Sequence, residues 1–102
     1  YPELAGGKGG FELDVESDRV KEWTKRCLEE FCGFSTGKHF LIGGDEWQTP
    51  NHLLVDPDFN VAEAWANHVN MAVDVLKRHN RIPIVWHDML LHYPEALKLL
   101  DK

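Results

Sequence analysis

The chain has 102 residues, of which 43% are hydrophobic and 27% charged, and its formal net charge at pH 7 is -6. This composition is typical of a globular protein, and scattered lysines and arginines under a negative net charge argue against a nucleic-acid partner. No stretch is long and apolar enough to cross a membrane, so we expect neither nucleic acid nor a membrane as a partner.

The first expected elements are a loop and an amphipathic helix. Residues 1–16 are rich in glycine and are predicted to form a loop, in which the alternation of residues 11–15 allows a short extended stretch. Ser17 is a good N-cap, and a helix is predicted from there to a stop at Gly33. Its apolar residues recur at helical spacing: Val20, Trp23, Cys27, Leu28 and Phe31.

The two cysteines, Cys27 and Cys32, are five residues apart. This spacing does not place both side chains on one face of a helix, so we expect buried or free thiols. Unpaired cysteines favour a reducing intracellular compartment.

Two short apolar strands flank a second helix. Residues 38–42 and 82–86 are each predicted to form a buried strand. Between them, Asn60 and Glu63 form a capping box that starts a helix ending near His79. The apolar face of this helix is predicted to consist of Val61, Trp65, Val69, Ala72 and Leu76.

The remaining segments are a loop and a third helix. Residues 47–60 contain prolines at 50 and 57 and are predicted to form a long loop. The third helix is predicted to begin at Pro94, since proline suits the first turn, and to include Leu97 and Leu100.

The strand-helix-strand order brings two polar clusters together. Nearly all such units have parallel strands, so both strands are expected to end at the same edge of the sheet. Asp45 and Glu46 follow the first strand, and the second ends in Trp86, His87 and Asp88. Because active sites of barrels and open α/β sheets lie at this edge, we predict a functional site there.

The adjacent carboxylates Asp45 and Glu46 are the main candidates for catalysis. Two such groups in a partly dry cleft cannot both ionise freely, so one is expected to keep its proton and to act as a general acid. Hydrolysis of a glycosidic bond requires such a group. Alternatively, Asp45 and Glu46 belong to an ordinary solvated turn that follows the two glycines and has no catalytic role.

Residues 43–46, Gly-Gly-Asp-Glu, resemble the signature that ends the fourth barrel strand of glycoside hydrolase family 20, the β-N-acetylhexosaminidases. Residues 1–4, Tyr-Pro-Glu-Leu, are similar to the segment before that strand, and residues 82–86 are similar to the fifth strand, which ends in a pocket tryptophan. The family often has a histidine where this chain has Leu41.

The resemblance implies an α/β fold. Since a (β/α)8 barrel takes about 250 residues, residues 1–102 would be a partial catalytic barrel domain, roughly the fourth and fifth strand-helix units. The remainder of the barrel would then be needed for activity.

The resemblance also implies a reaction and a role for each site residue. Family members are exo-acting enzymes that remove terminal β-linked N-acetylglucosamine or N-acetylgalactosamine with retention and without a cofactor. The substrate's own acetamido oxygen replaces the enzymic nucleophile. Carried over, Glu46 would protonate the leaving oxygen and then activate water, and Asp45 would hydrogen-bond the acetamido N–H. Trp86 would wall the acetamido pocket, unless it packs between strand and helix.

Three other interpretations stay open. A two-carboxylate glycosidase of another barrel family would keep Glu46 as the acid and take its nucleophile or base from outside this segment. A non-catalytic carbohydrate-binding module would keep the cleft without turnover. A metal site is the least favoured, because no ligand pair has the spacing of a zinc motif among His39, Asp45, Glu46, His87 and Asp88.

Overall fold

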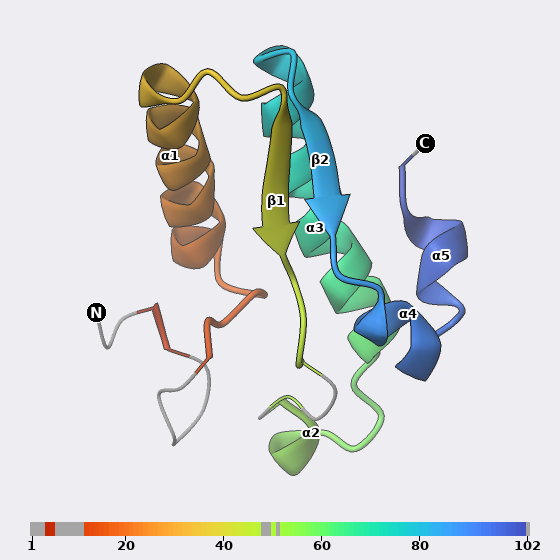
Figure 1. Ribbon diagram of the computed structural model, residues 1–102. Helices are drawn as coiled ribbons and strands as arrows, with labels where there is room; N and C mark the ends of the chain where they lie inside the picture. Colours follow the sequence, from red (N-terminus) through yellow and green to blue (C-terminus); the bar gives the residue numbers. More distant parts are fainter. Residues whose placement is uncertain (1–3, 6–11, 48–49, 51, 102) are drawn as a thin grey trace.

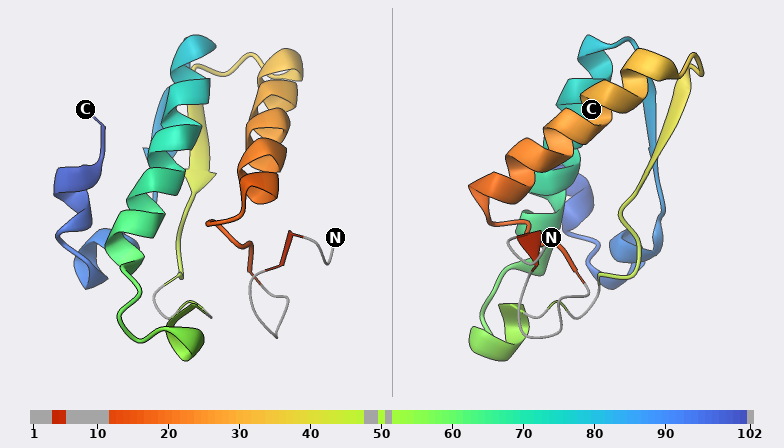
Figure 2. Two further views of the ribbon diagram at one scale, coloured as in Figure 1. Left: turned by 180° about the vertical axis from the view of Figure 1, so that it is seen from behind. Right: turned by 90° about the vertical axis from the view of Figure 1, so that its left-hand side faces the viewer.

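The computed structural model describes residues 4–5, 12–47, 50 and 52–101. Two helices, α1 (Asp18–Phe34) and α3 (Val61–Arg78), lie on one face of a sheet made of β1 (His39–Gly43) and β2 (Ile82–Val85) (Figures 1 and 2). The described residues also form three short helices: α2 (His52–Val55), α4 (Asp88–His92) and α5 (Ala96–Leu99). Most of the predicted N-terminal loop, including residues 1–3 of the Tyr-Pro-Glu-Leu segment, lies outside the described residues.

Strands β1 and β2 pair in parallel, as predicted from the strand-helix-strand order. The Ile82 N–H donates to the Lys38 carbonyl at 2.8 Å, and the Trp86 N–H donates to the Gly43 carbonyl at 3.1 Å. The two bonds hold opposite ends of the sheet. Each predicted strand is confirmed to within one residue at its ends.

Helix α3 is the centre of the core. The Asn60 side chain caps it by accepting from the Glu63 N–H at 3.0 Å, so the predicted capping box is confirmed as the start of the helix. Every residue of the predicted apolar face is buried. The helix packs against α1 and against both strands, which explains why its apolar stripe is wide.

The predicted first helix is confirmed as α1 to within one residue at its ends. Gly33 does not stop the helix, which continues to Phe34 and is capped by Ser35. Both the N–H and the hydroxyl of Ser35 donate to the Phe31 carbonyl, at 3.0 and 2.6 Å. At the other end Ser17 occupies the N-cap position, but its side chain makes no capping hydrogen bond.

Arg81 ties the end of α1 to the start of β2. One guanidinium nitrogen donates to the Ser35 hydroxyl at 3.1 Å and to the Gly37 carbonyl at 2.7 Å. The other donates to the carbonyls of Cys32 and Ser35 at 3.0 and 2.6 Å. A guanidinium suits this position, because its fork of donors satisfies carbonyls left open at a helix end and its charge opposes the helix dipole.

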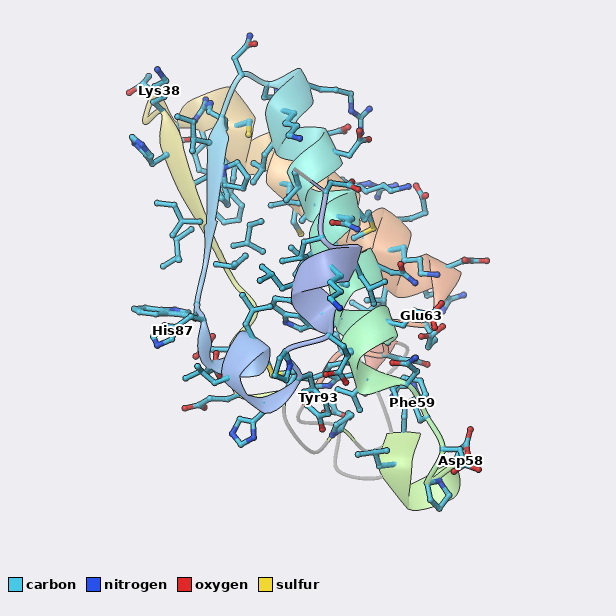
Figure 3. The ribbon with its side chains drawn as sticks, turned by 90° about the vertical axis from the view of Figure 1, so that its right-hand side faces the viewer. Lys38, Asp58, Phe59, Glu63, His87 and Tyr93 are labelled. Carbon is cyan, nitrogen blue, oxygen red and sulfur yellow. The ribbon has the colours of Figure 1, made fainter. Side chains whose placement is uncertain are left out.

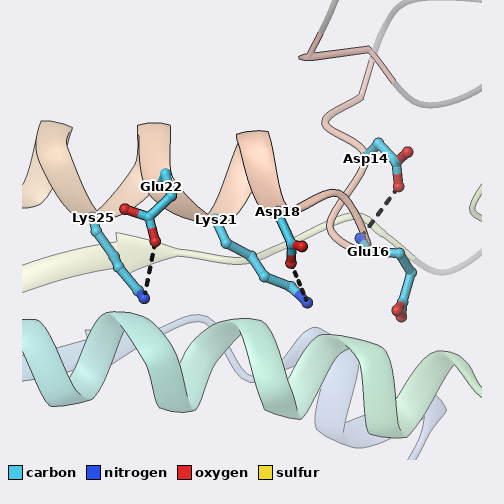
Figure 4. A network of polar contacts seen from close by, with 6 residues as sticks. All are labelled: Asp14, Glu16, Asp18, Lys21, Glu22 and Lys25. Carbon is cyan, nitrogen blue, oxygen red and sulfur yellow. Dashed lines mark hydrogen bonds and ion pairs between the residues drawn. The ribbon is translucent and has the colours of Figure 1, made fainter.

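The rest of α1 carries exposed ion pairs and a partly covered apolar face. Lys21 pairs with Asp18 at 4.0 Å and Lys25 pairs with Glu22 at 3.4 Å, and such exposed pairs contribute little to stability (Figure 4). On its inner side Val20, Leu28 and Cys32 are buried. Trp23 and Phe31, predicted on the packed face, remain 38% and 50% exposed, so the described residues cover only part of the apolar stripe.

The C-terminal segment forms two short helices where one was predicted. Helix α4 follows β2 almost directly, and Pro94 precedes α5 instead of starting it. The Asn70 side chain fixes this segment to α3, because it donates to the Leu99 carbonyl and accepts from the Asp101 N–H, both at 2.8 Å. The predicted loop over residues 47–60 likewise contains the short helix α2. No helix in the described ranges is long and apolar enough to span a membrane.

Replacing Arg81 with methionine is expected to lower the free energy of unfolding by about 2 to 3 kcal/mol, because several acceptors at the end of α1 lose a charged donor. Arg81→Lys should recover only part of this loss, since an ammonium group lacks the planar fork. Urea unfolding followed by far-UV circular dichroism measures both.

The matched control is Arg78→Met, which removes an exposed ion pair with Asp74 at 3.6 Å. Its effect should stay within about 0.5 kcal/mol. Equal losses at the two arginines would show that the hydrogen bonds of Arg81 do not stabilise the fold.

Candidate active site

The candidate site lies where the two strands end. Asp45, Glu46, Trp86, His87 and Asp88 line one hollow of about 420 Å³. Figure 1 shows both strand arrows pointing towards this edge, with α4 beside it. The predicted meeting of the two polar clusters is therefore confirmed by the structure.

The chain leaves β1 through a turn with left-handed backbone. The φ angles are 89° at Gly43, 75° at Gly44 and 59° at Glu46. Glycine adopts such angles freely, whereas a residue with a side chain does so at a cost of about 1 to 2 kcal/mol. Backbone strain at a residue other than glycine is concentrated at functional sites, and here it falls on the predicted acid.

Three hydrogen bonds hold this turn, from α3, from α4 and from the residue that follows β2. The Trp65 indole N–H on α3 donates to the Gly44 carbonyl at 2.8 Å. The Asp88 carboxylate on α4 accepts from the Glu46 N–H at 2.8 Å. The third is the bond from the Trp86 N–H to the carbonyl of Gly43. Together they fix the backbone on both sides of Asp45.

The supporting roles of Trp65 and Asp88 are not predicted by the sequence analysis. Trp65 lies at core spacing on its helix, and it is 4% exposed. A buried indole N–H generally requires an acceptor. A tryptophan at core spacing therefore indicates a hydrogen bond inside the protein, but not which carbonyl accepts it. The contact is also close, since a Cβ at Gly44 would lie 3.4 Å from the Trp65 ring nitrogen.

The predicted catalytic and binding side chains are open to solvent. Asp45 and Glu46 are both exposed, so the partly dry cleft expected from the sequence is not formed by the described residues alone. Trp86 is 51% exposed. The alternative in which Trp86 packs between strand and helix is therefore wrong, and its ring is available at the rim.

Of the candidate metal ligands, His39 lies away from the hollow. His39 begins β1, and the hollow lies beyond the end of that strand. Figure 3 shows the neighbouring Lys38 and the rim residue His87 at opposite ends of the sheet. Among the described residues no three histidine, cysteine, aspartate or glutamate side chains are grouped as metal ligands. Cys27 and Cys32 are free thiols.

An aromatic cluster anchors the chain just after Glu46. The His52 ring stacks on Phe59 with centroids 4.7 Å apart, and the Trp47 ring approaches both edge-on. His52 Nε2 also lies 3.0 Å from the Asp14 carboxylate. His52 therefore has a structural role, because it joins the segment before α1 to the segment that follows Glu46.

Comparisons of the chain with models of protein families, with curated proteins and with solved structures gave no match. The function of the site is therefore inferred from its residues and their geometry.

Trp65→Phe is expected to lower the free energy of unfolding by about 1 to 3 kcal/mol, because it keeps the ring but leaves the Gly44 carbonyl without its donor. The turn that carries Asp45 and Glu46 should also become more mobile. Chemical denaturation and amide hydrogen exchange at residues 44–46 measure the two effects.

Trp23→Phe is the matched control, because Trp23 is 38% exposed and lies on α1. It should leave exchange at residues 44–46 unchanged. Unaltered exchange in the Trp65 variant as well would show that the indole does not hold the turn.

Proposed function

We propose that this chain is part of the catalytic (β/α)8 barrel of an exo-acting β-N-acetylhexosaminidase. The enzyme would hydrolyse terminal β-linked N-acetylglucosamine or N-acetylgalactosamine by substrate-assisted catalysis with retention. One observation carries the proposal: Asp45, Glu46 and Trp86 meet at the carboxyl edge of two parallel strands. The resemblance of residues 43–46 and 82–86 to glycoside hydrolase family 20 supplies the chemistry.

The uncovered face of the sheet supports a barrel. The helices cover one face, whereas Leu41, Ile82 and Ile84 on the other are 52%, 42% and 44% exposed. Sheets of parallel strands are normally covered on both faces. A closed barrel would cover this face with side chains of the opposite strands, since barrel interiors are filled by branched apolar residues.

Each step of the proposed reaction uses a group at the rim. The Glu46 carboxylic acid would protonate the leaving oxygen while the substrate's acetamido oxygen attacks the anomeric carbon, which closes an oxazolinium ring. The Asp45 carboxylate would accept a hydrogen bond from the acetamido N–H and stabilise the positive charge that develops there. Water, activated by the Glu46 carboxylate, would then open the ring. The exposed ring of Trp86 would contact the acetamido methyl group.

The strain at Glu46 argues against a non-catalytic binding module. A binding loop could place glycine at φ 59° without cost, whereas this chain keeps a glutamate and ties its N–H to Asp88. A two-carboxylate glycosidase, with its nucleophile or base from outside this segment, is the remaining alternative. Asp88 is the third carboxylate of the hollow, beside Asp45 and Glu46. Its bond to the Glu46 backbone favours a supporting role.

In the complete enzyme, Glu46→Gln should slow substrates with poor leaving groups far more than activated aryl glycosides, because only the former need a proton. Asp45→Asn should slow both kinds of substrate, because the acetamido group takes part in every turnover. The measurement is kcat/KM on the paired substrates for each variant. Equal losses for the Glu46 variant would contradict its role as the acid.

The attacking group of the substrate provides a second test. An aryl β-glucoside with a 2-hydroxyl in place of the 2-acetamido group should be nearly inert, because it lacks the nucleophile. Loss of a methyl-sized contact alone would cost only about 1 to 3 kcal/mol in selectivity. A thiazoline mimic of the cyclic intermediate should bind much more tightly than substrate.

Comparable turnover of the two sugars, without thiazoline inhibition, would support the two-carboxylate alternative. Two measurements on the same enzyme preparation decide between an N-acetylhexosaminidase and a two-carboxylate glycosidase. They are the ratio of kcat/KM for the paired aryl glycosides and the inhibition by the thiazoline.

A further inference from the structure

Asp88 starts α4 between two residues that are fixed to the rest of the protein. Two positions before it, the Trp86 N–H donates to the Gly43 carbonyl at 3.1 Å. Directly after it, the Met89 side chain is 1% exposed and belongs to the same core cluster as Trp65. The Asp88 side chain itself is half-buried. Its carboxylate therefore projects from backbone that is anchored on both sides.

The bond between Asp88 and Glu46 acts on a backbone conformation that glutamate does not favour. Glu46 has a φ of 59°, in the left-handed region where the Cβ atom of an ordinary residue crowds the backbone. Its N–H donates to Asp88 Oδ2 at 2.8 Å, and hydrogen bonds to a charged acceptor are stronger than those between neutral groups. The other two bonds of the turn reach the carbonyls of Gly43 and Gly44. The bond from Asp88 thus holds the strained residue directly.

The sign of φ at Glu46 decides where its carboxyl group lies. Rotation about the N–Cα bond out of the left-handed region moves Cβ to another side of the backbone, and the carboxyl group moves with it. In the structure Glu46 lines the hollow together with Asp45 and Trp86. A general acid has to lie within hydrogen-bond reach of the oxygen that it protonates. The conformation that Asp88 stabilises is therefore the one that keeps the acid in the hollow.

We propose that Asp88 is the positioning residue of the acid: its carboxylate holds the Glu46 N–H and so keeps the Glu46 carboxyl group beside Asp45 and Trp86. Asp88 takes no part in proton transfer or in attack on the sugar. Its catalytic consequence rests on the proposed function, whereas its effect on the Glu46 backbone does not.

Two substitutions separate the position of this acceptor from its charge. Asp88→Asn keeps a carbonyl oxygen at the same distance from the backbone and removes the charge. Asp88→Glu keeps the charge and moves the oxygens outwards by one methylene group. A positioning residue depends on where its acceptor lies, so asparagine should be the better replacement. A carboxylate that acted as nucleophile or base would depend on its charge, so glutamate should be the better replacement.

In the chain itself, hydrogen exchange of the Glu46 amide reports whether the bond is made. Asp88→Glu should speed this exchange by about tenfold or more, because an N–H without its acceptor opens to solvent more often. Asp88→Asn should leave the exchange nearly unchanged. The nuclear Overhauser effect between the amide and α protons of Glu46, which lie closer together at positive φ, should weaken in Asp88→Glu and persist in Asp88→Asn.

The matched controls are Asp74→Asn and Asp74→Glu. Asp74 is an exposed carboxylate of α3 that pairs with Arg78 and does not line the hollow. Both variants should leave exchange of the Glu46 amide unchanged. Far-UV circular dichroism shows whether each variant is folded. If Asp88→Glu is not folded, Asp88→Ala, which has no acceptor in its side chain, takes its place in the exchange measurement.

In the complete enzyme, the same variants are assayed on a substrate with a poor leaving group. Asp88→Glu should lower kcat by about a hundredfold with little change in KM, since displacing a catalytic group by about 1 Å has an effect of this size. Asp88→Asn should recover most of this loss. An activated aryl glycoside, which needs no proton from Glu46, should be hydrolysed at nearly the same rate by every variant. A general loss of folded enzyme would slow both kinds of substrate equally.

Three outcomes would overturn the proposal. Unchanged exchange of the Glu46 amide in Asp88→Glu would show that Asp88 does not hold the acid. Exchange that is equally fast in Asp88→Asn and Asp88→Glu would show that the position of the acceptor is not what matters. A lower kcat for Asp88→Asn than for Asp88→Glu would make Asp88 a catalytic carboxylate. A complete enzyme without glycosidase activity would contradict the proposed function instead, and the exchange measurements would still decide whether Asp88 holds Glu46.

Discussion

The parallel pairing of β1 with β2 is the constraint on which the other features depend. Because α3 carries the chain back across the sheet, both strands end at the same edge, and the Glu46 N–H reaches a carboxylate 42 residues away. Among the described residues β1 pairs only with β2, and α1 lies beside its other edge. The ladder thus places the polar rim at one end of the sheet and leaves α1 to pack against α3.

The parts of the fold that the sequence predicts well are those with local causes. The capping box at Asn60 and the apolar periodicity of α3 act within a few turns, and both are confirmed. The contacts that complete the end of α1 do not follow from local sequence, because the carbonyls of Cys32 and Ser35 accept from Arg81, which is distant in sequence. The exposure of Trp23 has a similar origin, since periodicity identifies an apolar face but not the element that covers it.

The candidate site also combines features that the sequence predicts with contacts between distant residues that it does not predict. Strand order and the Gly-Gly-Asp-Glu segment are enough to bring Asp45, Glu46 and Trp86 to one rim. The contacts that hold the turn come from Trp65 and Asp88, and neither contact follows from spacing along the chain. The left-handed backbone at Glu46 is equally invisible in sequence, because no residue-type preference predicts a strained glutamate.

The hydrogen bonds from Arg81 to the end of α1 also affect the order in which this segment folds. Residue 81 is synthesised after all of α1, so the Cys32 and Ser35 carbonyls lack their charged donor until then. The apolar side of α1 can pack against α3 before β2 is complete, whereas the end of α1 gains its charged donor only with Arg81. Loss of β2 would remove these donors, so the end of α1 and the start of β2 should gain and lose stability together.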